Sequence, residues 1–204
     1  MIGLIRKDLY SILKYCRTLL LMSALFLTMS AFSEQNFFFV IYPVIFAGVL
    51  PVTLISYEER DGWNRTCDTM PLSRKTVVNE RYLMALLCFF ALYLVTMAVQ
   101  AAVMLPKGRG RELLELAALL PAFGLLSPAV MLPISLRWGV EKGRLAYYVM
   151  IGGLVAVGVY AANSTADLSA EINPAAIGAI LGAALLLFAL SWLISIRLYE
   201  KREL

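Results

Sequence analysis

The chain has 204 residues, of which 61% are hydrophobic and only 16% are charged, and its net charge is +4 at pH 7. Its mean hydropathy of +0.78 is far above that of a soluble domain, which excludes a water-soluble enzyme or binding module. It contains no His, so the commonest general base and metal ligand is missing. The composition predicts an all-α integral membrane protein.

Residues 1–17 predict an amphipathic helix that lies in the membrane interface. Lys7, Ser11 and Lys14 lie on one side of a 3.6-residue helix, and such a basic side faces anionic headgroups. The apolar arc opposite consists of Ile2, Ile5, Leu9, Ile12, Leu13 and Cys16. The alternative is that this segment only extends the first span into the cytoplasm.

Six transmembrane helices are expected to follow within a single transmembrane domain, 1–204. Five charge-free runs come near or exceed the ~18 residues that mark a spanning helix. They are 37–57, 82–105, 116–136, 145–162 and 172–196. A sixth run, 18–33, is shorter and reaches spanning length if its helix starts in the preceding turn. The alternative for this first run is a signal peptide, because Ala31-Phe32-Ser33 resembles a cleavage site.

The basic residues predict the orientation of these spans. Of the 18 Lys and Arg residues, only Lys107, Arg109 and Arg111 fall in connections on one side of a six-span arrangement. The other 15 lie on the opposite side, which the positive-inside rule assigns to the cytoplasm. Both termini are therefore expected to be cytoplasmic. The Lys107 to Arg111 cluster departs from the pattern, and the sequence offers no reason for it.

The connection between the second and third spans, 58–81, is the longest aqueous segment and carries the densest charge. Ser73 is expected to cap a helix that continues through Arg81 directly into the third span. Before it, residues 62–69 are expected to form a short helix across the membrane surface. That helix would present Trp63, Asn64, Arg65 and Asp68. We interpret the segment as a docking element, and the alternative is a solvated loop without a partner.

The energy source is expected to lie outside this chain. Every aqueous connection is shorter than ~40 residues, and segments below that length rarely fold into a domain without disulfides or metals. The sequence also has no Gly-x-x-x-x-Gly-Lys-Ser/Thr loop, which binds the phosphates of ATP in many ATPases. The spans have no charged residue deeper than Glu115, near one edge. This argues against proton coupling and less strongly against sodium coupling, because backbone carbonyls can hold that ion. The chain is therefore expected not to be an enzyme.

A few helix-breaking and polar side chains inside the spans are candidates for a transport pathway. Pro43 and Pro51 interrupt the second span, and prolines at 121, 128 and 133 interrupt the fourth, so both helices are expected to be kinked or locally unwound. Gln100 is the strongly hydrogen-bonding side chain near the middle of the third span. Static packing for the prolines and an interhelical hydrogen bond for Gln100 are the alternatives.

The chain resembles the permease subunits of type-two ABC exporters, specifically the small six-span bacterial branch that includes the phenol-soluble-modulin peptide exporter. The resemblance covers essentially the whole chain. It rests on Ile5-Arg6-Lys7-Asp8, Glu58-Glu59, Met70-Pro71-Leu72-Ser73-Arg74, Arg81-Tyr82 and Tyr199-Glu200-Lys201-Arg202. Met70 replaces Leu and Arg81 replaces Lys in the family pattern.

The resemblance implies that 58–81 contains a coupling helix seated in a cleft of an ATPase subunit. The ATPase-docking residues would be Trp63, Asn64, Arg65, Asp68 and Arg74. ATP and Mg would bind to the partner ATPase, and this chain would hold no cofactor or metal. A second permease chain, identical or not, would complete a dimer.

Together these features predict a permease subunit in the bacterial plasma membrane. Because its pathway would be lined by aliphatic, aromatic, Ser, Thr and Gln side chains, amphipathic peptides or lipid-like compounds are the expected cargo. Gly178 and Gly182 offer a small-residue face at which two helices can approach closely. The alternative function is a membrane-embedded immunity or scaffold protein without transport activity.

Overall fold

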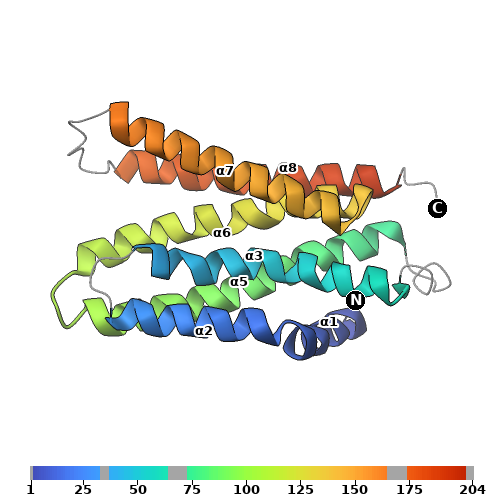
Figure 1. Cartoon of the computed structure of the whole chain (residues 1–204), viewed down its shortest axis with the longest axis horizontal. Coiled ribbons are helices and arrows are strands. Elements are labelled where there is room, and N and C mark those ends of the chain that lie inside the picture. Colours follow the sequence, from blue (N-terminus) through green and yellow to red (C-terminus); the bar gives the residue numbers. More distant parts are fainter. Residues whose placement is uncertain (1, 33–36, 64–72, 165–173, 201–204) are drawn as a thin grey trace.

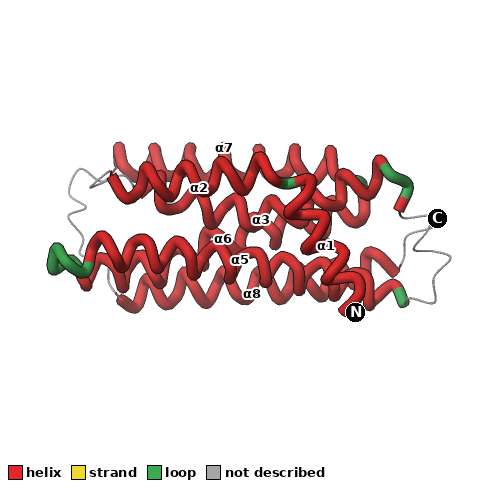
Figure 2. Tube along the Cα trace, turned by 90° about the horizontal axis from the view of Figure 1, so that it is seen from below, coloured by secondary structure: helices red, strands yellow, loops and turns green. Residues whose placement is uncertain are grey.

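The computed structural model of the protein describes residues 2–32, 37–63, 73–164 and 174–200. Apart from short turns, these residues are helical, and the described part contains no strand (Figure 2). The helices are α1 (Ile2–Tyr15), α2 (Arg17–Phe32), α3 (Phe37–Arg60), α5 (Arg74–Met104), α6 (Gly110–Trp138), α7 (Val140–Ser164) and α8 (Pro174–Glu200). The expected all-α class is confirmed.

The long helices lie side by side and run alternately in opposite directions (Figure 1). Helix α1, the last turn of α3, the start of α5 and the turn between α6 and α7 lie at one end, which we call the α1 end. The described N-terminal and C-terminal residues lie at this end too (Figure 1). The turn between α5 and α6 lies at the opposite end, which we call the far end.

Several helices are long and apolar enough to cross a bilayer. Among the described residues, α3, α5, α6 and α8 meet this condition, and α1 with α2 make a fifth if this bent pair counts as one span. Helix α2 alone has 16 residues, which is short for a ~30 Å hydrocarbon core. The structure thus supports a multi-pass membrane protein. The predicted span at α7, which with the bent pair would bring the number to six, stays a prediction.

Helix α6 lies at the centre of the bundle and packs against α3, α5, α7 and α8. Glycines make two of these approaches close. A Cβ on Gly48 of α3 would lie 2.6 Å from Pro128 Cδ, and a Cβ on Gly124 of α6 would lie 2.5 Å from both Phe89 and Val44. A larger residue at either site would force the helices apart. The core is therefore set by backbone proximity as well as by apolar side chains.

Ser73 caps α5 as the sequence predicts. Its backbone is extended at φ −73° and ψ 144°, and its hydroxyl accepts the Thr76 N–H at 3.2 Å. This satisfies one of the free donors of the first helical turn. Helix α5 then continues without interruption past Arg81 to Met104. A displacement at its first turn is thus carried along one rigid element toward the far end.

Helix α1 makes an angle of 71° with α2, with Cys16 at the break. Its buried face carries Asp8 and Ile12, and Cys16 at the break is buried as well, whereas Leu9 and Leu13 of the predicted apolar arc are 42% and 59% exposed. The interfacial placement of α1 stays a prediction.

One residue on the predicted basic side of α1 has a partner within the chain. Lys7 was expected to face lipid headgroups, but its ammonium donates to Glu58 of α3. A charge-assisted hydrogen bond to a carboxylate is strong, and periodicity along α1 does not reveal a partner on another helix.

The prolines do not unwind their helices. Helix α3 is continuous through Pro43 and Pro51, and α6 is continuous through Pro121, Pro128 and Pro133. Pro43 and Pro51 are both buried. The expected local unwinding is therefore not found in the described helices. Prolines are tolerated in spanning helices where neighbouring groups can satisfy the carbonyls left without an N–H donor.

Candidate functional site

Five charged side chains from three helices meet at the α1 end of the bundle. They are Lys7 and Asp8 of α1, Glu58 of α3, and Glu80 and Arg81 of α5. We call this set the Arg81 cluster. Asp8 and Arg81, which are hydrogen-bonded to each other, are 73 residues apart in sequence. The cluster therefore ties the first helix of the chain to both helices that flank 58–81.

Arg81 is the centre of the cluster. Its guanidinium donates to Asp8 Oδ2 at 2.6 Å and to Glu58 Oε2, and its Nε lies 3.3 Å from Glu80 Oε2. The Arg81 side chain is 5% exposed and the Asp8 side chain 0%. The planar fork of Arg suits this arrangement, because it can bind several carboxylates at fixed angles. Lys7 adds a second cation, which lies 2.9 Å from Asp8 and pairs with Glu58.

Three carboxylates thus surround two cations, so one negative charge is in excess. Glu80 precedes the charge-free run that starts at Tyr82, and it is 2% exposed. Burial, followed by its hydrogen bond to Asp8, raises the pKa of Glu80 to about 8. Asp8 Oδ1 lies 2.9 Å from the Lys7 ammonium but receives no well-aligned hydrogen bond, and Glu80 Oε1 is likewise buried without a donor among the described residues. A proton held on Glu80 gives Asp8 that donor and leaves the cluster neutral.

Glu59, the next residue after Glu58, reaches in a different direction. Its Oε2 accepts the N–H of Val140 at 3.4 Å, at the start of α7. A carboxylate at this position interacts favourably with the partial positive charge of the helix N-terminus. Gly139 has φ +91°, which ends α6 in a conformation that suits glycine. The adjacent pair Glu58-Glu59 therefore connects the end of α3 to α1 and α5 on one side and to α7 on another.

Two of the predicted docking residues lie within the described part of the chain. Trp63 follows the turn after α3, is half-buried, and has the Lys7 ammonium 4.1 Å from its ring centroid. Its indole N–H is buried and finds no acceptor among the described residues. Arg74 is exposed at the start of α5. Asn64, Arg65 and Asp68, with most of the predicted surface helix 62–69, lie outside the described residues.

The structure separates the predicted pathway residues from the Arg81 cluster. Gln100 is 2% exposed, and its amide donates to the Ser30 hydroxyl of α2. This is the interhelical hydrogen bond that the sequence left open as an alternative. Pro43 and Pro51 are buried in α3. A pathway role for these three residues stays a prediction.

The Arg81 cluster was not found by the sequence analysis, although Asp8, Glu58 and Arg81 were noted there separately. Each lies near the end of an apolar segment, where charged residues are normally solvated. A second polar group was also missed: the Tyr82 hydroxyl lies 2.7 Å from both Ser191 and Ser195 of α8. Among the described residues, no three His, Cys, Asp or Glu side chains are arranged to hold a metal ion.

Comparison with known protein families matches residues 3–200 of the chain to the ABC-2 family transporter protein family. The match begins in α1 and ends at the last residue of α8, so it includes every helix of the bundle and the whole Arg81 cluster. No curated protein and no solved structure matches the chain significantly. The multi-pass helical bundle and this match establish that the chain belongs to the ABC-2 family of transporter proteins, as the membrane-spanning permease subunit of an ABC transporter.

Proposed function

We propose that the chain is the permease subunit of an ATP-driven exporter, and that ATP hydrolysis by a partner subunit acts on it through 58–81. An ABC-2 permease has an ABC ATPase as its partner. ATP and Mg would bind to that ATPase and not to this chain. The observation that carries the proposal is the Arg81 cluster, because it joins both flanks of 58–81 to α1 through buried ion pairs.

The connections at the α1 end support a mechanical role for this segment. A force on 58–81 reaches α3 through Glu58 and α5 through Arg81. It reaches α7 through the Glu59 contact with Val140, and α1 through Asp8. Buried ion pairs of good geometry resist separation strongly. These helices would therefore move together when the ATPase subunits close, and the bundle would expose a pathway outward.

The proposed cargo is an amphipathic peptide or a lipid-like compound. The described surface of the bundle carries many exposed apolar side chains, including Leu94 at 64% and Leu186 at 67%. Such faces meet lipid or a second permease chain. The proposed assembly is a dimer of permease chains with two ATPase subunits, in the bacterial plasma membrane. Small apolar and hydroxyl side chains in the spans suit apolar or amphipathic cargo better than ions or sugars.

The docking role of Trp63 is tested by a double substitution, Trp63→Ala with Arg65→Glu. Loss of a packed aromatic side chain and reversal of a charge at a docking surface typically cost ~2 kcal/mol or more, which is about thirtyfold in affinity. The variant is expected to insert and stay folded but to lose the ATPase on copurification. It is also expected to lose substrate-stimulated ATP hydrolysis, measured on the reconstituted complex.

The matched control is Arg111→Glu at the far end, where the Arg111 side chain is 76% exposed. This variant reverses the charge of one Arg and should keep both the ATPase and its stimulation. Full ATPase association of the Trp63 and Arg65 variant would disprove the docking assignment. A chain that copurifies with no ATPase even as wild type would favour the immunity or scaffold function.

The proposed six-span topology, with both termini in the cytoplasm, predicts which ends of the bundle react with a membrane-impermeant thiol reagent. In a background without Cys16, Cys67 and Cys88, a Lys107→Cys variant should be labelled on intact cells. A Lys142→Cys variant should be labelled only after lysis. Both residues are exposed. Lys107 belongs to the turn between α5 and α6 and Lys142 to the first turn of α7, and these two segments lie at opposite ends of the bundle (Figure 1). Labelling of position 142 on intact cells would contradict the proposed orientation.

A further inference from the structure

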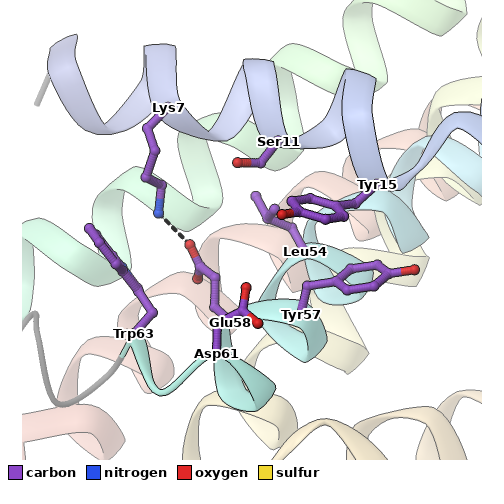
Figure 3. A pocket seen from close by; sticks show the side chains of 8 residues that line it. All are labelled: Lys7, Ser11, Tyr15, Leu54, Tyr57, Glu58, Asp61 and Trp63. Carbon is purple, nitrogen blue, oxygen red and sulfur yellow. Dashed lines mark hydrogen bonds and ion pairs between the residues drawn. The ribbon is translucent and has the colours of Figure 1, made fainter.

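A cavity of about 180 Å³ lies between α1 and the end of α3, beside the Arg81 cluster (Figure 3). It is lined by Lys7, Ser11, Tyr15, Leu54, Tyr57, Glu58, Asp61 and Trp63. The volume is below the ~300–1,000 Å³ of sites that enclose drug-sized ligands, so it suits a single headgroup or functional group. It lies where the charge-free run of α3 ends, and the end of such a run is where a spanning helix leaves the hydrocarbon core for the headgroup region.

The charges at this cavity favour a cation. Its charged lining consists of Lys7, Glu58 and Asp61, and Lys7 is already paired with Glu58. Asp61 is exposed, and its carboxylate has no ion-pair or hydrogen-bond partner in the part of the chain that the structure describes. In Figure 3 this carboxylate is directed into the space beneath Ser11 and Tyr15. An anion placed there would face two lining carboxylates and one lining cation, Lys7, which is already paired. The Lys14 ammonium is not part of the lining and lies 5.3 Å from the centroid of the Tyr15 ring.

Aromatic rings form much of the remaining wall. Tyr15 and Tyr57 are stacked with their centroids 5.0 Å apart, and Trp63 lies across the cavity from them (Figure 3). Aromatic faces attract ammonium groups within about 6 Å, and cages of such rings with a carboxylate are the usual receptor for methylated ammonium. The chain supplies an example, because the Lys7 ammonium lies 4.1 Å from the Trp63 ring and pairs with Glu58.

We propose that this cavity binds an organic ammonium group, held by the Asp61 carboxylate and by the aromatic rings of Tyr15 and Tyr57. The group is either the headgroup of an amine-containing phospholipid in the inner leaflet or the ammonium of a free organic cation. Ser11 offers a hydroxyl to the same space. The proposal is independent of ATPase docking and of the direction of transport.

The test uses Trp63 as the reporter. Trp138→Phe and Trp192→Phe remove the other two Trp residues, and the full chain is placed in nanodiscs of phosphatidylglycerol alone. Titration with choline should change the Trp63 emission in a saturable way. Its uncharged isostere 3,3-dimethylbutan-1-ol should not. Absence of a saturable choline response, or an equal response to the alcohol, would overturn the proposal.

Two variants locate the site. Asp61→Asn should raise the apparent dissociation constant for choline about fivefold, since exposed ion pairs are weak. Glu141→Gln removes the same charge from another exposed position at the α1 end and should leave the dissociation constant unchanged. An unchanged affinity in Asp61→Asn would place choline elsewhere and overturn the assignment. If inorganic phosphate competed with choline for the cavity, the site would bind anions, and the proposal would also be overturned.

A second titration, in nanodiscs of a different lipid composition, distinguishes the two sources of the ammonium group. If the headgroup of a phospholipid occupies the cavity, phosphatidylethanolamine added to the nanodiscs should raise the apparent dissociation constant for choline. This effect should disappear in Asp61→Asn. If phosphatidylethanolamine has no effect while choline still binds through Asp61, the cavity takes a free cation. Either result supports the ammonium site.

Discussion

Arg81→Gln is expected to lower the free energy of unfolding by ~3–5 kcal/mol, the usual cost of breaking a buried ion pair on one side. The substitution leaves Lys7 as the only cation of the Arg81 cluster for the carboxylates of Asp8 and Glu58. Asp8 is 0% exposed and Glu58 11%, so water cannot replace the lost guanidinium. The difference in the free energy of unfolding between the variant and the wild-type chain is measured in detergent micelles.

Matched variants separate the cluster from a general charge effect. Arg111→Gln, at the exposed far end, is expected to change stability by less than ~0.5 kcal/mol. Arg81→Lys keeps the charge but loses the planar fork, so its loss should be intermediate. Glu80→Gln should be close to neutral, because the raised pKa of Glu80 already keeps that carboxyl mostly protonated at pH 7. A stability of Arg81→Gln equal to that of the wild type would show that the ion pairs do not hold α1 in place.

A double substitution tests whether the partners act as a unit. Asp8→Asn removes a carboxylate that Arg81 holds at 2.6 Å. Combined with Arg81→Gln, it should cost less than the sum of the two single losses, because the second change removes the charge that the first leaves unpaired. Strict additivity would indicate that Asp8 and Arg81 are stabilised by separate contacts.

Much of the fold follows from local sequence signals. Charge-free runs predict the positions of the long helices, and the Ser73 cap with its continuation through Arg81 was predicted and is confirmed. Each of these features depends on residues that lie only a few positions apart, so the sequence of that segment alone is enough to predict it. The docking assignment of Trp63 and Arg74 also comes from local pattern and from family resemblance, and it stays a prediction.

The Arg81 cluster could not be predicted in this way. Asp8, Glu58 and Arg81 lie on three helices, and each has a plausible local environment as a solvated charge at the end of an apolar run. Which charges converge depends on how the helices are placed against one another. Lys7 shows the consequence, because helical periodicity placed it on the side that faces anionic headgroups but could not reveal that the fold pairs it with Glu58.

Glycine spacing gave an equally incomplete result. The pattern around Gly178 and Gly182 predicted a close helix approach, but a Cβ at either position meets nothing within 4 Å. The close approaches are instead at isolated glycines, among them Gly48 and Gly124. A small-residue pattern shows that a face is smooth but does not reveal whether a helix of the same chain, a second chain or lipid covers it.

Gly124→Leu is expected to lower the free energy of unfolding by ~3 kcal/mol or more, at or above the upper end of typical overpacking effects. Even the first added carbon would lie 2.5 Å from Phe89 and Val44, and these side chains come from α5 and α3. Both are buried in the main core, so neither can move away without displacing its helix. The measurement is again unfolding in detergent micelles.

Gly182→Leu is the matched control. In the monomer, this substitution should not lower the free energy of unfolding. Nothing lies within 4 Å of the added Cβ, and Leu is a better helix former than Gly by up to ~1 kcal/mol. The stability of the monomer should therefore stay the same or rise. If a second permease chain covers this face in the proposed dimer, the same variant should reduce the dimer fraction, measured by crosslinking in membranes. An unchanged dimer fraction would assign the face to lipid, and a destabilised monomer would contradict the open surface at Gly182.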